Sequence, residues 1–428
     1  MLFNFIKKNI LRGHSDQQII IKNSFWLFLG EVINRGIVFI LFTLIARQIG
    51  VSSFGQLSSA LAFVTIFSIL TDFGTSTLFI KDVSRNNNLK DSYFYHIVII
   101  KIILSFLFLI PLFVLVKYLN EGPVFSSLVY LSYVYVVLSS FVTFLRTLFK
   151  AHEKMKYDAY SYILNGLVLL ILVGILIYFA LPIYVLLWGY IVSTLIAIFI
   201  TLIFLKRIYS FKKIPIKKET FVDILRSSTP FLLSAVCVYV YYYIDQVLLF
   251  NIQGPKEAGI YASAYRILAL LIAPIGLFLT AFLPTLSKNF NGRSLSSDVR
   301  TLILNNIKVI FFSSFVVFLT LFVFSKEIIT IIYGNDYIEA ILILRVLLIS
   351  WLILINYSVL VICLQAFNQQ KTYFYITFWG ALFNIILNVV LIIKYSTLGA
   401  AVATVLTELF VGITVSIYFF KNIWYKLK

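Results

Sequence analysis

The sequence predicts an all-α integral membrane protein of about twelve transmembrane helices in two six-helix lobes, and three observations lead to this fold class. Of its 428 residues, 61% are hydrophobic and only 12% are charged, about half the share found in soluble domains. Apolar runs of about 20 residues recur along the chain, and each can cross the hydrocarbon core. The runs are continuous rather than alternating, and lipid offers the backbone no hydrogen-bond partner, so helices rather than barrel strands must span it.

Twelve apolar segments follow one another along the chain. The fifth and sixth are separated only by Leu181 and Pro182, so they are either two spans or one long kinked helix, and the charge distribution favours two. The segments cover residues 25–46, 57–80, 93–116, 124–149, 160–180, 183–205, 228–250, 259–284, 302–324, 340–364, 373–393 and 398–420.

Basic residues are distributed unevenly between the connections. With twelve spans and a cytoplasmic N-terminus, 26 of the 35 lysines and arginines fall on the inner side and only 5 on the outer side. This asymmetry follows the positive-inside rule, so the segments 1–22 and 421–428 are expected in the cytoplasm and the protein in the cell inner membrane. The net charge of +18 then reflects topology and contact with anionic membrane lipids, and no nucleic-acid binding is expected.

The longest polar connection, residues 206–227, divides the chain near its middle. It is predicted to be a cytoplasmic linker between an N-lobe at 23–205 and a C-lobe at 228–420. Because each lobe holds six spans, the two lobes have the same orientation, which indicates a parallel repeat about an axis along the membrane normal.

Paired glycines support the repeat. Gly50 and Gly55, between the first two spans, recur as Gly254 and Gly259, between the seventh and eighth, at a constant offset of 204. Either the two halves are homologous, or the outer turns use glycine only for its conformational freedom.

The sequence lacks the motifs of an enzyme or of an ATP-driven pump. It contains neither the GxxxxGK[ST] loop nor the GxGxxG fingerprint. His14, His96 and His152 are scattered without metal-ligand spacing and are predicted to be surface residues. Cys237 and Cys363 fall within apolar spans, so no disulfide framework is expected. We expect no enzymatic activity, no cofactor and no bound metal, and a proton or sodium gradient as the source of energy.

Eight ionisable side chains lie within the predicted spans. Burying a charge in lipid costs at least about 2.5 to 3.5 kcal/mol, so these side chains should face protein or water. Their functional interpretation is a water-filled cavity between the lobes, in which basic groups hold phosphate oxygens and carboxylates bind protons or ions. The eight residues are Glu31, Arg35, Asp72, Lys101, Asp245, Arg266, Arg345 and Glu408.

The same charges have a structural interpretation. Four acids balance four bases, so the signs alone do not establish a cationic cavity, and opposite charges four residues apart on one helix can neutralise each other. The expected pairs are Glu31 with Arg35 on one helix, and Asp72 with Lys101 and Asp245 with Arg266 between neighbouring spans.

Tyrosine is concentrated just before Asp245. Tyr241 and Tyr242 lie one helical turn from this acid, where a phenol can hydrogen-bond the carboxylate or stack on a sugar ring. They are candidates for the lining of the cavity, and aromatic packing in the protein interior explains the same residues without a function.

Scattered motifs throughout the chain resemble those of the bacterial O-antigen flippase family, which handles polysaccharide export within the multidrug, oligosaccharidyl-lipid and polysaccharide exporter superfamily. In the first half they include the pentapeptide Ala-Arg-Gln-Ile-Gly at 46–50, Asp-Phe-Gly at 72–74 and Lys-Asp-Val-Ser-Arg at 81–85. In the second half they include residues 259–267 (GIYASAYRI), 283–287 (LPTLS) and 333–337 (YGNDY).

The resemblance implies a flippase that moves undecaprenyl-pyrophosphate-linked oligosaccharide from the cytoplasmic to the periplasmic leaflet by alternating access of two lobes, for O-antigen and lipopolysaccharide biosynthesis. Polysaccharide polymerase machinery would then be a partner. The candidates for binding phosphate or anionic sugars are Arg35, Lys101, Arg266 and Arg345, and those for ion coupling or gating are Glu31, Asp72, Asp245 and Glu408.

Two other functions are open. A multidrug or cation exporter of the same fold would use Asp72, Asp245 or Glu408 to bind a cation. A membrane polysaccharide polymerase is the less favoured choice, because that class usually has a large outer loop and every outer connection here is short.

Overall fold

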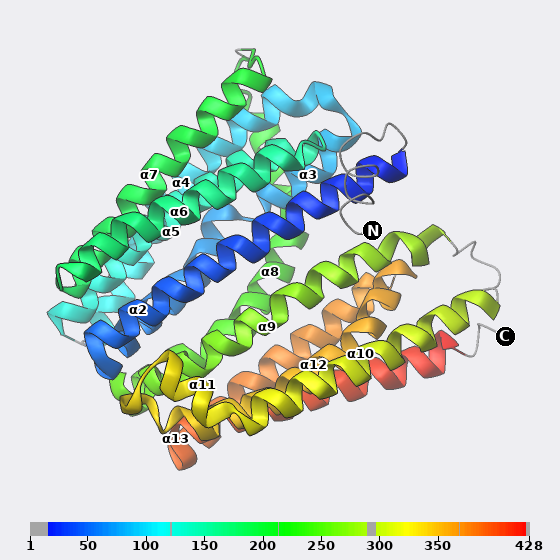
Figure 1. Cartoon of the computed structure of the whole chain (residues 1–428). Helices are drawn as coiled ribbons and strands as arrows, with labels where there is room; N and C mark the ends of the chain where they lie inside the picture. Colours follow the sequence, from blue (N-terminus) through cyan, green and yellow to red (C-terminus); the bar gives the residue numbers. More distant parts are fainter. Residues whose placement is uncertain (1–15, 120–121, 213, 289–296, 368, 425–428) are drawn as a thin grey trace, which may run out of the picture. The chain divides into compact units, whose positions relative to one another are not determined.

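The computed structural model describes residues 16–119, 122–212, 214–288, 297–367 and 369–424, and within these ranges the chain is helical with no strand. The all-α membrane fold class is therefore confirmed. The helices are α2 (Asp16–Asp72), α3 (Thr75–Arg85), η1 (Asn87–Leu89), α4 (Lys90–Leu119), α5 (Pro123–Ala151), α6 (Met155–Tyr178), α7 (Ile183–Ile208), α8 (Lys218–Gln253), α9 (Pro255–Lys288), α10 (Ser297–Val323), α11 (Ser325–Ile332), η2 (Asn335–Tyr337), α12 (Ala340–Ala366) and α13 (Gln370–Asn422) (Figure 1).

Nine helices of the described part of the chain are long and apolar enough to cross a membrane. Helix α13 contains two predicted spans, on either side of a break at Ser396. Helix α2 contains the first span and, after a break at Gly50, most of the second, which continues past Asp72 into α3. Helix α9 coincides with the eighth predicted span. The helices thus account for the twelve predicted spans.

Two boundaries sharpen the sequence prediction. The fifth and sixth spans are two separate helices, since α6 ends at Tyr178 and α7 begins at Ile183 after a turn with a left-handed residue at Ala180. The predicted linker is already helical from Lys218, where α8 begins. Helix α8 therefore begins before the apolar segment 228–250 and ends after it.

The first compact unit, unit 1, comprises the described parts of Met1–Gln48 and Ala60–Tyr239. Helices α5, α6 and α7 lie side by side in it, and α3 packs on α5 (Figure 1). Large apolar side chains from these helices, among them Phe79, Phe144 and Leu148, are fully buried in one cluster. This packing fixes the ends of the helices on which the charged residues of unit 1 lie.

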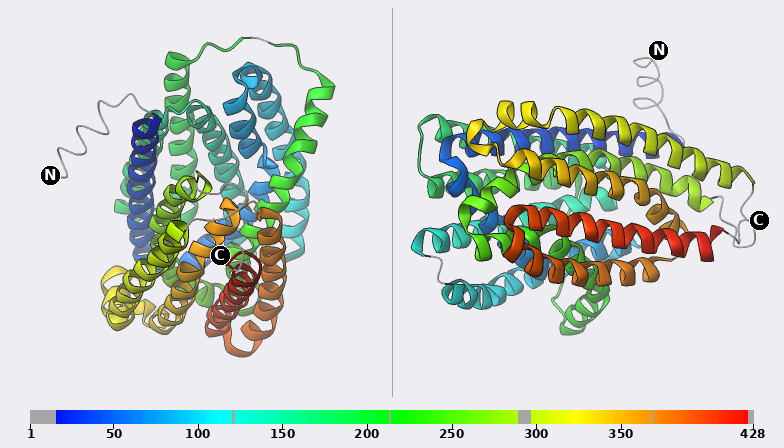
Figure 2. Two further views of the ribbon diagram at one scale, coloured as in Figure 1. Left: turned by 90° about the vertical axis from the view of Figure 1, so that its right-hand side faces the viewer. Right: turned by 90° about the horizontal axis from the view of Figure 1, so that it is seen from below.

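The second compact unit, unit 2, comprises Ile49–Ser59 and the described parts of Val240–Lys428. Helix α12 packs against α9, α10 and α13, and the views in Figure 2 show these helices running alongside one another. Gln246 on α8 donates to the Ser59 hydroxyl at 2.9 Å and to the Ala258 carbonyl at 3.0 Å. These bonds join α8, α9 and the short segment from α2.

The paired glycines have matching conformations. Gly50 has a φ of 75° and Gly254 a φ of 93°, so both occupy the left-handed region that favours glycine. Each ends one helical stretch and begins the next. Their constant offset in sequence thus corresponds to one structural role.

Gly55 and Gly259 allow two helices of unit 2 to cross at close range. A Cβ atom on Gly55 would lie 1.8 Å from the Pro255 carbonyl oxygen, and one on Gly259 would lie 2.1 Å from the Val51 carbonyl oxygen. Only a residue without a side chain fits at either position, as in other close helix crossings in membranes. The reciprocal contact supports the predicted repeat.

One prediction about the histidines is wrong. His96 is buried, with Nδ1 at 2.7 Å from the Ser92 carbonyl and Nε2 accepting the Lys217 N–H at 3.0 Å. Both ring nitrogens are used, so His96 fixes the backbone before α8 to α4. His152 is partly exposed, and His14 lies outside the described residues.

Candidate functional site

Unit 1 neutralises its most deeply buried base with an acid. Lys101 on α4 has a side chain only 1% exposed, and its Nζ lies 2.5 Å from Asp72 Oδ1 at the end of α2. It also donates to the Ser140 hydroxyl at 2.7 Å, while the Ser76 hydroxyl donates to Asp72. The predicted pair is formed. A buried ammonium group without a counter-ion costs free energy, so the ion pair with Asp72 allows Lys101 to be buried.

A second buried pair in unit 1 was not predicted. Arg146 on α5 donates through Nε to Asp158 on α6 at 2.8 Å, and both side chains are buried. The guanidinium carbon lies 3.8 Å from the centre of the Tyr162 ring. Arg146 lies within the last turn of the apolar segment 124–149, and it was grouped with the inner-side charges. Its position inside that segment could have indicated a buried ion pair.

Glu31 and Arg35 form the predicted pair along one helix face. Arg35 Nη2 lies 2.9 Å from Glu31 Oε1, and the two side chains are 43% and 28% exposed. Such exposed pairs contribute little to stability. The charges are thus available to other partners.

Unit 2 holds its acids differently. Asp245 on α8 is buried and accepts hydrogen bonds only from uncharged groups of the described residues: Asn388 Nδ2 at 2.7 Å, the Thr404 hydroxyl at 2.8 Å and the Tyr261 hydroxyl at 2.9 Å. Among the described ion pairs, none joins Asp245 to Arg266. In the described contacts the carboxylate is held by uncharged dipoles.

Oxygen acceptors outnumber donors around Asp245. Asn388 Nδ2 faces three acceptors, which are Asp245 Oδ1, the Asn384 carbonyl at 3.0 Å and Asn384 Oδ1 at 3.1 Å. The Thr404 hydroxyl has one proton for two acceptors, Asp245 and the Ala400 carbonyl. Asn388 Oδ1 is buried without a donor in the described part of the chain. Such a set of oxygens suits a proton or a hard monovalent cation.

Glu408 on α13 is the second buried acid of unit 2. Its Oε1 accepts the Tyr241 hydroxyl at 2.5 Å, and its Oε2 accepts the Tyr357 hydroxyl at 2.7 Å. A Cβ atom on Gly412 would lie 2.9 Å from the Tyr357 ring, so glycine at that position makes room for the ring. Tyr242 packs edge-on against Tyr241. Tyr241 therefore serves Glu408, whereas its sequence position had suggested Asp245.

Arg345 and Arg266 are the candidate substrate-binding bases of unit 2. Arg345 on α12 donates to the Ser325 hydroxyl at 2.7 Å, and its guanidinium carbon lies 5.4 Å from the centre of the Phe322 ring. Arg266 is half-buried on α9. Their binding of phosphate or anionic sugar stays a prediction.

The residues that hydrogen-bond Asp245 were not predicted from the sequence. Asn384 and Asn388 lie on one face of α13 within an otherwise apolar span, and Thr404 follows after the break at Ser396. Two amides four residues apart in a membrane helix are costly unless they bond to something. That spacing was an available signal.

Long apolar helices with carboxylates buried inside them define a multi-pass membrane transporter rather than an enzyme. The family model described as "Polysaccharide biosynthesis protein" matches residues 20–290, and the model described as "MatE" matches residues 230–390. The chain belongs to the polysaccharide biosynthesis protein family.

Two curated relatives span nearly the whole chain. One is "Uncharacterized membrane protein MJ1375" of Methanocaldococcus jannaschii, 27% identical, with 91% of this chain and 95% of the relative covered. The other is "Probable low-salt glycan biosynthesis flippase Agl15" of Haloferax volcanii, 24% identical, with 90% of this chain and 80% of the relative covered.

Solved structures share the fold. An inward-facing multidrug resistance MATE family transporter superposes with a TM-score of 0.73 at 16% identity, covering 98% of both chains. A MOP superfamily transporter from Pyrococcus furiosus, described as having a binding pocket of reversed polarity, superposes with a TM-score of 0.64 at 17% identity over 98% of both chains.

Proposed function

We propose that this protein is a flippase that moves a polyprenyl-linked oligosaccharide across the cell inner membrane, from the cytoplasmic to the outer leaflet, by alternating access. Undecaprenyl pyrophosphate is the lipid carrier that the sequence resemblance favours. The family match and the likeness to a glycan biosynthesis flippase over most of both chains support this choice. O-antigen assembly, with a polysaccharide polymerase downstream, is the pathway expected for the product.

The observation on which the mechanism depends is the Asp245 cluster. A buried carboxylate held only by uncharged donors costs free energy when it is ionised in a membrane, so it favours the uptake of a proton or a cation. Uptake would remove the negative charge and draw the oxygens of Asn388 and Thr404 toward the ion. Helices α8, α9 and α13 meet at this cluster, so ion uptake is coupled to their packing. We propose that Asp245 couples an ion gradient to transport.

Substrate binding is assigned to the basic residues predicted from the sequence. Arg35 is the strongest of them, because its side chain is 43% exposed and its ion pair among the described residues is the exposed one with Glu31. Arg266 and Arg345 are further candidates. Lys101 is the weakest, since its ammonium group is enclosed by Asp72 and Ser140.

A drug exporter is the second candidate function. Asp245 and Glu408 are buried acids that occur in none of the described ion pairs, and with the surrounding tyrosines they form a setting that suits an organic cation. Resistance to cationic drugs on overexpression would favour this function. Unchanged drug sensitivity together with loss of surface polysaccharide on deletion would favour the flippase.

The decisive test is to delete the gene in its host and to locate lipid-linked oligosaccharide with a membrane-impermeant sugar-modifying probe on spheroplasts. Accumulation on the cytoplasmic side, reversed by the intact gene but not by the Asp245→Asn variant, is the expected result. Undisturbed polysaccharide would reject the flippase. Outward-facing accumulation of single units would point to polymerisation instead.

A further inference from the structure

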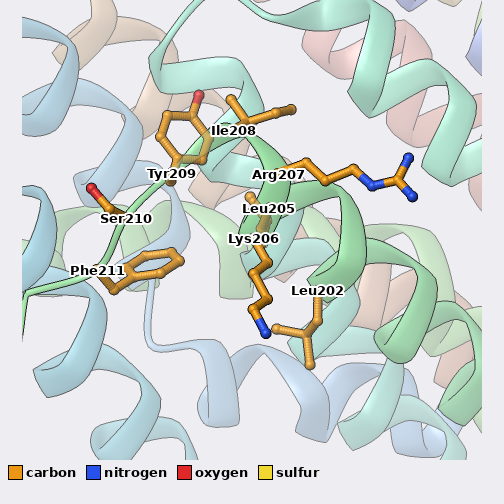
Figure 3. Close-up of a pocket in the computed structure, with 8 residues that line it drawn as sticks. All are labelled: Leu202, Leu205, Lys206, Arg207, Ile208, Tyr209, Ser210 and Phe211. Carbon is orange, nitrogen blue, oxygen red and sulfur yellow. The ribbon is translucent and has the colours of Figure 1, made fainter.

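A cavity of about 790 Å³ opens at the end of α7 in unit 1, at the side that the basic residues predict to be cytoplasmic. Its walls are the last turns of α7 and the segment after it. Figure 3 shows Lys206 beside Leu202, with Tyr209 and Phe211 on the opposite side, and Arg207 extending away from these rings. The mouth of the cavity is therefore both basic and aromatic.

Two further lysines from other helices face the same aromatic wall. Lys90 Nζ, at the start of α4, lies 5.3 Å from the centre of the Tyr209 ring and 5.9 Å from that of Phe211. Lys154 Nζ, before α6, lies 5.2 Å from the Tyr209 centre. The two ammonium groups are thus at most 10.5 Å apart, the sum of their distances to this ring. A phosphate group near either ammonium group could accept a hydrogen bond from it.

Two acids, Asp91 and Glu153, lie close to these lysines and offset part of their charge. Asp91 lies 3.9 Å from Lys90, a long and partial contact, and the exposed Glu153 precedes Lys154. Burial lowers the pKa of His152 between α5 and α6, and Lys90 and Lys154 lower it further, against the opposing effect of the Leu148 carbonyl. A neighbouring imidazole thus experiences the positive potential of the two lysines.

An apolar stripe runs along the exposed face of α7, starting at the cavity. Five large side chains spaced by three or four residues are exposed on it, and the next residue in this spacing is Lys206. From the first of the five to Lys206 the helix rises about 27 Å, close to the thickness of the hydrocarbon core. The stripe consists of Trp188, Val192, Leu195, Phe199 and Leu202.

We propose that this cavity binds the phosphate group of an anionic lipid, whose hydrocarbon chain lies along the stripe on α7. Leu202 and Lys206 line the cavity and belong to the stripe, so one ligand can occupy both. Glycerophospholipids and polyprenyl phosphates share the required chemistry, a phosphate ester on a long chain. Basic pockets between membrane helices bind such head groups elsewhere. A glycerophospholipid in this cavity would be separate from the transported substrate, whereas a polyprenyl phosphate would be its carrier, a case that rests on the proposed function.

The test uses the purified full-length protein in a nonionic detergent, with bound lipid quantified by native mass spectrometry. The probes are phosphatidylglycerol, phosphatidylcholine, a polyprenyl phosphate and inorganic phosphate. The triple variant Lys90→Gln, Lys154→Gln and Lys206→Gln should bind phosphatidylglycerol at least about tenfold more weakly. The matched control removes three exposed charges elsewhere in unit 1, by Arg85→Gln, Lys218→Gln and Arg226→Gln, and should bind as the unaltered protein does.

Equal losses in both triple variants would overturn the proposal, because the attraction would then be that of the whole surface. Inorganic phosphate that displaces the lipid at equal concentration would also overturn it, since the chain would contribute nothing. Preference for polyprenyl phosphate would identify the carrier lipid as the ligand, and equal affinity a membrane phospholipid. If the triple variant does not fold, Lys154→Gln alone should weaken binding about fivefold. Unchanged binding in that variant would reject the site.

Discussion

The two units of this protein hold the acids of their apolar helices in different ways. In unit 1, Asp72 pairs with Lys101, Asp158 with Arg146 and Glu31 with Arg35. In unit 2, the described hydrogen-bond donors to Asp245 and Glu408 are all uncharged. A base fixes an acid in its ionised form, whereas neutral donors leave it able to take up an ion. The ion coupling that we propose for Asp245 therefore belongs to unit 2.

The largest effect is expected from breaking the central pair of unit 1. Asp72→Asn leaves the Lys101 ammonium buried without a counter-ion, and should destabilise the protein by about 3 kcal/mol. Lys101→Met should cost less, because the Asp72 side chain is 27% exposed and that of Lys101 only 1%. Thermal unfolding in detergent micelles measures both. The double variant should recover most of the loss, and failure to do so would mean that the pair is not an independent unit.

The corresponding change in unit 2 should affect transport rather than stability. Asp245→Asn retains the size of the side chain but cannot bind a proton or cation as a charge. Gradient-driven transport in proteoliposomes should fall about 5- to 150-fold, the usual range of coupling free energies, with no loss of thermal stability. If Asp245→Asn loses as much thermal stability as Asp72→Asn and the folded protein still transports normally, the proposed difference between the two units is wrong.

A smaller effect is expected at Glu408. Tyr241→Phe removes the donor to Oε1 and should cost about 1.5 to 3 kcal/mol while the acid is ionised. The same change in a Glu408→Gln background should cost less, as thermal unfolding of the four proteins of a double-mutant cycle would show. Tyr242→Phe, whose ring packs against Tyr241, is the matched control and should change stability little. Equal costs in both backgrounds would mean that the bond to Glu408 is unimportant.

The smallest change in stability is expected at the exposed pair. Arg35→Gln should destabilise the protein by no more than about 0.5 kcal/mol, because exposed ion pairs along a helix contribute little. If Arg35 binds the phosphate or anionic sugar of the substrate, transport should decline while the unfolding temperature is maintained. Unaltered transport would remove Arg35 from the substrate-binding set.

Part of the candidate site followed from local sequence. Glu31 and Arg35 pair because four residues make one helical turn, and Asp72 meets Lys101 because successive spans lie side by side. Two partners of Asp245, Asn388 and Thr404, come from a helix more than a hundred residues further along the chain. The expected neighbour Arg266 is not its partner among the described ion pairs. The separation of two residues in the sequence does not show whether the helix faces on which they lie meet in the fold.

The class of protein, the helical spans and their approximate ends followed from the sequence alone. Apolar runs of this length cross the membrane, and in lipid their backbone N–H and C=O groups can form hydrogen bonds only within a helix. The sequence also located the acids and bases that must avoid lipid. Only the tertiary structure decided which of them are neutralised. Packing between helices placed Lys101 on Asp72 but surrounded Asp245 with amides and hydroxyls, since rotation of a helix about its axis depends on the side chains of all its neighbours.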